Sequence, residues 1–367
     1  MPHAAAPIVL LTCGDPAGIG PEVVVKAWHV ASLHAQARLR VVADAALLSR
    51  VLAERSGLPH LGVRRIDATN GSCSNAGELL VIEPHAAAPG AVVPGRATAA
   101  GGALAAAAVL TAASLVRSGR AQAIVTGPLH KEALHAAGYD VPGHTELLAR
   151  DCGLADDDVS MMLWLPAESG PGGLGVVHVT LHEPLARALA RITTTGIEQA
   201  GVRLSGLLEP LLAAASSGRR PRIAVAALNP HGGESGLFGD EEQRIVAPAV
   251  RLLQEAGIDA SGPLPADTLF LRAGRGEFDG VVALYHDQGH IPVKLLGMHR
   301  AVNITLGLPF VRTSVAHGTA FDIVGTGAAD PASMVAAIAA ATRLVAAGWP
   351  LRAAAASVAA RATPSRR

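Results

Sequence analysis

Short apolar runs rich in β-branched residues alternate with helical stretches along almost the whole chain, and this alternation constrains the fold more than any other feature. Such runs are typical of strands buried on both faces, with the intervening helices covering the sheet. The pattern therefore predicts an α/β fold with a mostly parallel sheet. We expect strands at 8–12, 39–43, 123–126, 161–165, 175–180, 223–228, 280–284 and 301–305, and helices at 21–34, 98–118, 184–190, 194–215, 241–256 and 331–347.

Length and charge narrow the class of protein. The 367 residues suggest two domains, and 30 Lys+Arg against 30 Asp+Glu leave no net charge. Because the chain also lacks a basic run, we expect neither a nucleic-acid partner nor a membrane partner. Residues 97–116 carry no charge over a length that could span a bilayer, but they are mostly Ala, Gly, Thr and Ser, so we expect a buried helix.

The cysteines and the N-terminal residues indicate a compartment. Three cysteines at wide spacing fit neither a disulfide framework nor a Cys-x-x-Cys metal site, which favours a reducing environment. The segment 1–7 has no cationic stretch ahead of the first apolar run, so no export signal is expected. Together these features predict a cytoplasmic protein.

Lysine is rare in this chain. Of the thirty basic residues only Lys26, Lys131 and Lys294 are lysines. A compositional bias toward arginine accounts for most of this difference. Under such a bias, the positions that keep lysine are candidates for needing a compact, rotatable ammonium that a guanidinium cannot replace.

Three histidines each follow an expected strand: His182, His231 and His286. Ligands of an open parallel sheet bind outside the carboxyl ends of its strands, so these imidazoles could together hold Zn²⁺ or a similar divalent ion. For any one of them, a hydrogen-bonded loop histidine is the simpler interpretation, but their common position favours a joint site. His178 and His290 are close competitors, and the mid-strand position of His178 indicates a structural role.

Two glycine-rich segments could approach a ligand. Segment 12–22 has glycines at positions 14, 18 and 20, which do not match the Gly-x-Gly-x-x-Gly fingerprint. A ligand at the following helix N-terminus and a plain tight turn remain equally open for it. Segment 317–327 contains Asp322 and could bracket the adenosine half of a nucleotide, although an ordinary loop is a strong alternative.

Polar side chains gather in three further segments. In 143–146, Thr145 as a helix N-cap is favoured over an anion grip by His144 and Thr145. Segments 285–294 and 303–314 are dense in polar residues between apolar strands. Their Lys294 and Arg312 are natural partners of a phosphate or carboxylate.

Seven segments, in order along the chain, resemble the 4-hydroxythreonine-4-phosphate dehydrogenases of pyridoxal phosphate biosynthesis, and the match runs from about Ile8 to Ala347. They are GDPAGIGPE at 14–22, TGPLHK at 126–131, GHTE at 143–146, LNPH at 228–231, GPLPADT at 262–268, YHDQG at 285–289 and NITLGLPFVRTS at 303–314. The resemblance implies an isocitrate/isopropylmalate dehydrogenase-like fold with two α/β/α domains and a cleft between them. It also implies a homodimer with sites at the subunit interface.

The resemblance implies domain roles and an activity. Residues 1–135 plus 300–367 would form a nucleotide-binding domain, and residues 136–299 would bind metal, substrate and the partner subunit. The enzyme would oxidise a small phosphorylated hydroxy-amino acid, 4-phosphooxy-L-threonine, to 2-amino-3-oxo-4-phosphooxybutanoate. This β-keto acid then loses CO₂ to give 3-amino-2-oxopropyl phosphate, because a metal stabilises the enolate.

Individual residues also acquire roles through the resemblance. One divalent metal per site (Zn, Mg or Co) would be bound by His182, His231 and His286. The substrate would be bound by His144, Thr145, Lys294, Asn303 and Arg312. The cofactor, NAD or NADP, would be bound by a loop that includes His317, Gly318, Asp322 and Gly325. The candidate proton acceptors are Lys131, Asp267 and Asp287.

Three departures from the family pattern bear on the substrate. Ala316 stands where the family usually has Asp, His290 replaces a usual apolar residue, and a loop around 166–174 is added. His290 resembles paralogous branches that oxidise threonate or erythronate 4-phosphate or aromatic cis-dihydrodiols. The intact GHTE and VRTS segments favour a phosphorylated substrate. A metal-dependent phosphohydrolase and a catalytically silent phosphometabolite-binding protein are alternatives of other classes.

Overall fold

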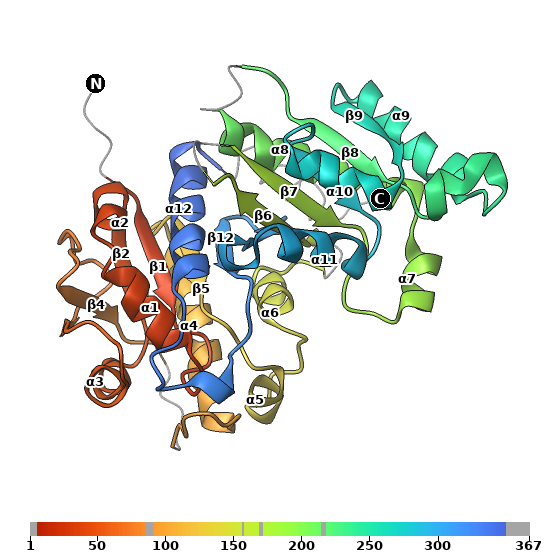
Figure 1. Ribbon diagram of the computed structural model, residues 1–367. Helices are drawn as coiled ribbons and strands as arrows, with labels where there is room; N and C mark the ends of the chain where they lie inside the picture. The colour runs from red at the N-terminus through yellow and green to blue at the C-terminus, as the bar shows by residue number, and fades with distance from the viewer. Residues whose placement is uncertain (1–5, 86–90, 156–157, 169–171, 214–217, 350–367) are drawn as a thin grey trace, which may run out of the picture. The chain divides into compact units, whose positions relative to one another are not determined.

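The computed structural model describes residues 6–85, 91–155, 158–168, 172–213 and 218–349. The chain divides into two compact units, of which the first comprises Met1–Val159 with Leu308–Arg367 and the second Ser160–Gly307. Strands and helices alternate in each unit, as the colour sequence in Figure 1 shows. The α/β class expected from the sequence is confirmed.

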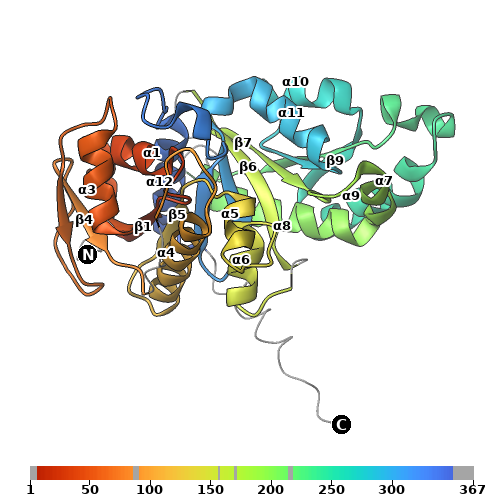
Figure 2. The same cartoon turned by 90° about the horizontal axis from the view of Figure 1, so that it is seen from below.

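The first unit is built on parallel strands. In neighbour order they are β3 (Gly62–Arg65), β4 (Glu78–Ile82), β2 (Arg38–Val42), β1 (Ile8–Thr12), β5 (Ala123–Thr126) and β12 (Val311–Val315). The helices described in this unit are α1 (Gly20–Trp28), α2 (Ala31–Gln36), α3 (Ala45–Glu54), α4 (Ala99–Arg117), α5 (Lys131–Ala136), α6 (His144–Asp151) and α12 (Ala332–Ala346). Figure 2 shows α12 and α4 on opposite faces of this sheet.

The apolar helix α4 is a core helix of the first unit. It is the one described helix long and apolar enough to cross a membrane, but most of it is buried inside the unit. Its Val109 and Ala112 lie in one buried cluster with Leu10 of β1 and Ile124 of β5. The expectation of a buried helix at 97–116 is therefore confirmed, because a sheet of fully apolar strands needs such a cover.

The second unit has a mixed sheet. In neighbour order its strands are β11 (Val302–Leu306), β6 (Ser160–Pro166), β7 (Gly173–His178), β10 (Gly280–Ala283), β8 (Arg222–Ala226) and β9 (Asp259–Leu264). The pairings of β6 with β11 and with β7 are antiparallel, whereas those of β7 with β10, β10 with β8 and β8 with β9 are parallel. The α-helices described here are α7 (Leu185–Arg191), α8 (Thr194–Leu212), α9 (Ala247–Glu255), α10 (Ala266–Gly274) and α11 (His286–Gly297).

The unit boundaries differ from the expected domain limits at 135/136 and 299/300. The first unit keeps α5 and α6, because Leu134, Leu147 and Leu148 are buried in the same apolar cluster as α4. The second unit keeps β11, which pairs with β6 over its whole length, from Val302 opposite Trp164 to Leu306 opposite Ser160.

Every expected strand is present with small shifts at its ends, whereas β3, β4, β9 and β12 were not expected. The expected helix 21–34 is divided into α1 and α2, because Val30 adopts an extended backbone between them. The expected helix 241–256 begins with a π-helical turn at Glu242–Val246 before α9. Four helices that were not expected are α3, α5, α10 and α11.

Asp279, a buried residue, links the amino ends of three parallel strands through its backbone and its carboxylate. Asp279 directly precedes β10, its backbone bonds both β7 and β8, and its side chain is almost fully buried. Its carboxylate accepts a two-pronged bond from Arg219 at 2.6 and 2.9 Å and a backbone bond from Arg222 at 2.8 Å. Burial alone would raise the pKa of Asp279, but these donors bring it below its usual value.

We expect Asp279→Asn to lower the free energy of unfolding by about 2–3 kcal/mol, because it leaves charged donors without their carboxylate. The pKa of Asp279 is depressed in the folded state, so its contribution is present above the unfolded pKa of about 4 and is lost as pH falls through the folded pKa. Urea titrations at neutral and acid pH measure both effects. The control is Asp240→Asn, which removes an exposed ion pair with Arg244 and should cost about 0–1 kcal/mol. Equal losses in the two variants would contradict the assignment.

Candidate active site

Three parallel strands of the second unit, β7, β10 and β8, end at one edge of its sheet. The three histidines expected to bind metal all follow these strands. His286 is the first residue of α11 after β10, His182 lies shortly after β7, and His231 lies in the 3₁₀ segment after β8. The sheet therefore delivers all three to its carboxyl edge, as ligand sites of such sheets require.

Two of the three histidines lie together. The ring centroids of His182 and His286 are 5.7 Å apart. The Nδ1 atom of His286 lies 2.7 Å from a carboxylate oxygen of Asp287, so the proton on Nδ1 leaves Nε2 with a free lone pair. This arrangement fits a metal-binding imidazole oriented by a carboxylate. Within the described ranges no group of three His, Cys, Asp or Glu side chains is arranged to hold an ion, so the three-histidine metal site stays a prediction.

The loop that carries His231 is unusual in its backbone. His231 has φ of 54°, in the left-handed region, and glycines 232 and 233 also have positive φ. The buried carboxylate of Glu242 holds the start of the loop, accepting bonds from the backbone N–H of Leu228 at 2.8 Å and of Asn229 at 2.7 Å. Burial alone would raise the pKa of Glu242, but these bonds bring it below its usual value. Sequence reasoning missed Glu242, since it lies in an ordinary helical pattern.

A second histidine pair lies beneath His286. His290 Nδ1 is 3.0 Å from His178 Nε2 and 3.2 Å from the carbonyl oxygen of His286, which can only accept, so a proton on His290 Nδ1 satisfies both. The rings of His290 and His286 stack with centroids 3.7 Å apart. Burial, followed by the charges of His286 and Lys294, lowers the pKa of His290 to about 4, and burial also lowers that of His178. Both rings are therefore neutral at pH 7.

Close packing holds α11 over this pair. A Cβ atom at Gly289 would lie 2.4 Å from His178 Nε2 and 3.0 Å from Ala283 Cβ. Only glycine therefore allows α11 to approach the sheet this closely, which explains the glycine of the YHDQG segment.

The first unit contributes a cationic group next to a neutral imidazole. Arg312 on β12 is buried and donates to Thr126 Oγ1 at 2.7 Å. Burial lowers the pKa of Arg312 to about 10, so it stays charged at neutral pH. Burial, together with the Arg312 charge, holds the pKa of His144 well below its usual value. The buried His144 Nε2 has no hydrogen-bond partner among the described residues, as expected of a group that awaits a ligand.

The expectation that Thr145 is a helix N-cap is wrong. Helix α6 begins at His144 after the cap residue Gly143, so Thr145 lies inside the first turn. The Thr145 hydroxyl therefore does not cap the helix and can bond an anion at the N-terminus of α6, as the alternative interpretation expects.

The remaining expected substrate contacts belong to the second unit. Lys294 is exposed on α11, and Asn303 lies half-buried on β11. The Oδ1 atom of Asn303 is buried without a hydrogen-bond partner in the described part of the chain. A buried oxygen that accepts no hydrogen bond from the protein can accept one from a bound ligand.

The three candidate proton acceptors are all exposed. Lys131 begins α5 in the first unit, Asp267 lies in the first turn of α10 in the second unit, and Asp287 bonds His286. The geometry gives Asp287 an orienting role toward His286.

The expected cofactor residues lie on one loop of the first unit. His317 and Gly318 follow β12, whereas Asp322 and Gly325 precede α12. Asp322 and Gly318 are exposed. The ring of Phe321 in the same loop stacks on His130 at 4.8 Å.

Segment 12–22 is a tightly packed turn. A Cβ atom at Gly14, which has φ of 67°, would lie 2.1 Å from the carbonyl oxygen of Pro128, and one at Gly20 would lie 1.8 Å from that of Cys13. Backbone packing alone therefore requires these glycines.

Comparisons with known proteins agree with this geometry. Residues 35–341 match the protein family described as Pyridoxal phosphate biosynthetic protein PdxA. The chain is 45% identical over 330 residues to a D-threonate 4-phosphate dehydrogenase of Salmonella typhimurium, covering 90% of this chain and 96% of that protein. It is 44% identical over 344 residues to a 4-hydroxythreonine-4-phosphate dehydrogenase of Beijerinckia indica, covering 91% and 94%.

A solved structure extends the likeness to three dimensions. The crystal structure of a 4-hydroxythreonine-4-phosphate dehydrogenase from Klebsiella pneumoniae matches with a TM-score of 0.78 at 43% identity, covering 92% of this chain and 99% of that chain. Sequence and fold thus agree over almost the whole length. The chain belongs to the PdxA family and is a dehydrogenase that acts on a hydroxyl group of a phosphorylated four-carbon acid.

Proposed function

We propose that this enzyme uses NAD or NADP and a divalent metal to oxidise the 3-hydroxyl of a 4-phosphorylated four-carbon acid. The observation that carries the proposal is the carboxylate-oriented imidazole of His286 beside His182, at the carboxyl edge of a parallel sheet. His182, His231 and His286 would hold a zinc, magnesium or cobalt ion, which would supply Lewis acidity toward the substrate hydroxyl, and a bound dinucleotide would supply the hydride acceptor.

The residues of the chain then bind and orient the substrate. Buried Arg312 and neutral His144, with Thr145, form an anion-binding group for the phosphate, since guanidinium forks match phosphate oxygens. Exposed Lys294 supplies a point charge for an anionic group of the substrate. The Oδ1 atom of Asn303, which has no partner among the described residues, accepts a hydrogen bond from a substrate donor. Asp287 holds the proton of His286 Nδ1 and thereby fixes its tautomer.

For the substrate itself we propose D-threonate 4-phosphate first. His290, a departure from the usual family pattern, is buried and stacks directly on His286, so it alters the environment of the proposed metal site. The relatives with 45% identity include D-threonate 4-phosphate dehydrogenases. The second candidate is 4-phosphooxy-L-threonine, favoured by the intact GHTE and VRTS segments and by relatives such as the Beijerinckia indica enzyme.

We also propose that the enzyme is a cytoplasmic homodimer with sites at the subunit interface. Helices α10 and α11, with the residue directly after α11, expose large apolar side chains that a second copy could cover: Leu271, Ile291, Leu295 and Met298. Leu295 is 83% exposed, which is costly for a side chain of its size in water. The face adjoins α11, the helix that carries His286 and Lys294.

A substrate panel tests the reaction. With NAD⁺ or NADP⁺ and Zn²⁺, Co²⁺ or Mg²⁺, D-threonate 4-phosphate should give reduced nucleotide, CO₂ and a hydroxyketone phosphate. We expect its kcat/KM to exceed that of 4-phosphooxy-L-threonine by about tenfold or more, equivalent to about 1.4 kcal/mol of transition-state binding. The reverse ranking would assign pyridoxal phosphate biosynthesis instead. Phosphate release without nucleotide reduction would contradict a dehydrogenase.

The metal site has its own test. We expect His231→Asn to lose bound metal and to lower kcat at least about a hundredfold while the thermal midpoint stays near that of the wild type. Asparagine is chosen because it tolerates the left-handed backbone of His231. Metal content by elemental analysis and turnover after chelation and metal addition are measured together. The control is His60→Asn at an exposed histidine. Unchanged metal content in His231→Asn would disprove the three-histidine site.

A further inference from the structure

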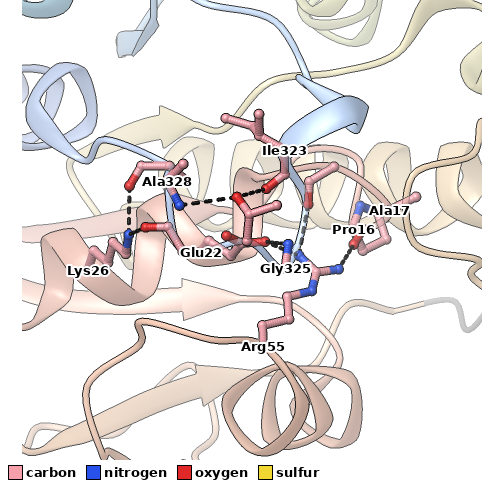
Figure 3. A network of polar contacts seen from close by, with 12 residues as sticks. Pro16, Ala17, Glu22, Lys26, Arg55, Ile323, Gly325 and Ala328 are labelled. Carbon is pink, nitrogen blue, oxygen red and sulfur yellow. Dashed lines mark hydrogen bonds and ion pairs between the residues drawn. The ribbon is translucent and has the colours of Figure 1, made fainter.

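We propose that Glu22, Lys26 and Arg55 are positioning residues that fix the 317–329 loop for dinucleotide binding. Glu22 and Lys26 bond the backbone of this loop directly, and Arg55 acts on it through its bond to Glu22 (Figure 3). The inference rests on the proposed function, which assigns this loop to the cofactor. All the residues concerned belong to the first unit.

The carboxylate of Glu22 joins three segments of the chain. It is fully buried on α1, and its Oε1 accepts a bond from Arg55 at 3.0 Å and one from the backbone N–H of Gly325 at 2.9 Å. Arg55, directly after α3, also donates to the carbonyl oxygens of Gly18 at 2.9 Å and Pro16 at 3.1 Å. A buried charge is tolerated only when it is paired and hydrogen-bonded, so this pair holds its neighbours in one arrangement.

Lys26 anchors the far end of the loop. Its Nζ donates to the carbonyl oxygens of Gly327 at 2.7 Å and Ala329 at 2.8 Å. A compact ammonium can turn its donors toward two carbonyls on one short stretch, whereas a planar guanidinium presents a fixed fork. The family resemblance implies roles for Lys131 and Lys294 but none for Lys26, and this contact accounts for a lysine at position 26 in an arginine-rich chain.

Backbone contacts complete the attachment. The N–H of Ile19 donates to the carbonyl oxygen of Thr319 at 3.0 Å. A Cβ atom at Gly18 would lie 2.7 Å from that same oxygen, and one at Gly57 would lie 3.1 Å from the Cα of Gly327. The loop therefore lies directly on the main chain of the turns at 18–19 and 56–57.

The opposite side of the loop remains available to a ligand. Gly318 and Asp322 are exposed, and a Cβ atom at Gly318 would meet nothing within 4 Å. A loop already ordered by its own protein loses less conformational freedom when it binds a ligand. Loosening the attachment should therefore weaken cofactor binding and leave the chemical step intact once the cofactor is bound.

The experiment compares Lys26→Met and Glu22→Gln with the wild type. Methionine keeps the apolar stem of the half-buried lysine, and glutamine keeps an acceptor at Oε1 but removes the charge. We expect the KM and the Kd for the dinucleotide to rise about tenfold, while kcat at saturating cofactor and the KM for the phosphorylated acid stay within about twofold. Kd is measured by calorimetry with NAD⁺ and NADP⁺ alone, without substrate.

Matched controls separate this role from general destabilisation. Arg64→Met and Glu78→Gln remove a surface ion pair of the same unit, 2.9 Å long, that does not touch the loop, and they should leave every constant unchanged. If the wild type binds a dinucleotide and both loop variants bind it equally well, the inference is overturned while the proposed function stands. Equal losses in kcat and in both KM values would also overturn it. A wild type that binds neither dinucleotide overturns the proposed function as well.

Discussion

The parallel pairing of β7, β10 and β8 is the constraint on which the candidate site depends. Because parallel strands point the same way, whatever follows them emerges at one edge of the sheet. The ion pairs of Asp279 stabilise the opposite edge, where the same strands begin. The ion pairs that stabilise the sheet therefore lie at the amino ends of these strands, and the candidate ligand residues lie at their carboxyl ends. The residues at the carboxyl ends can thus serve ligand binding rather than packing.

Continuous apolar runs predicted the central strands of both units, because a strand buried on both faces has no polar alternation. Two of the four strands that were missed, β12 and β9, break this rule for physical reasons. β12 carries Arg312, Thr313 and Ser314, all buried but polar, and β9 contains Ser, Gly and Pro. Helix α11 was missed because Gly289 and Pro292 are poor helix formers, yet Gly289 is needed for close packing on His178. Tertiary contacts stabilise these elements, and a local sequence pattern carries no information about tertiary contacts.

The same limit applies to the site. Position after a strand was enough to select His182, His231 and His286, because topology alone places them. Apart from Asp287, which is next to His286 in the sequence, the residues that support this edge of the sheet are not encoded in any spacing. His290 reaches His178 from 112 residues away, and Glu242 holds the His231 loop through backbone N–H groups, which every sequence has. Lys26 was singled out only by the scarcity of lysine, and its two carbonyl partners on the 317–329 loop could not be inferred from composition.

Burial keeps His144 of the first unit and His178 and His290 of the second unit neutral, and this affects what can bind beside them. His144 is kept neutral beside the charged Arg312, so the pair offers one positive charge and a neutral imidazole rather than two repelling cations. His290 is kept neutral under His286, where a protonated ring stacked at 3.7 Å would oppose a divalent cation. Burial therefore lets imidazoles crowd together without adding charge. A chain with no net charge can in this way carry the proposed anion-binding group in one unit and the proposed metal-binding edge in the other.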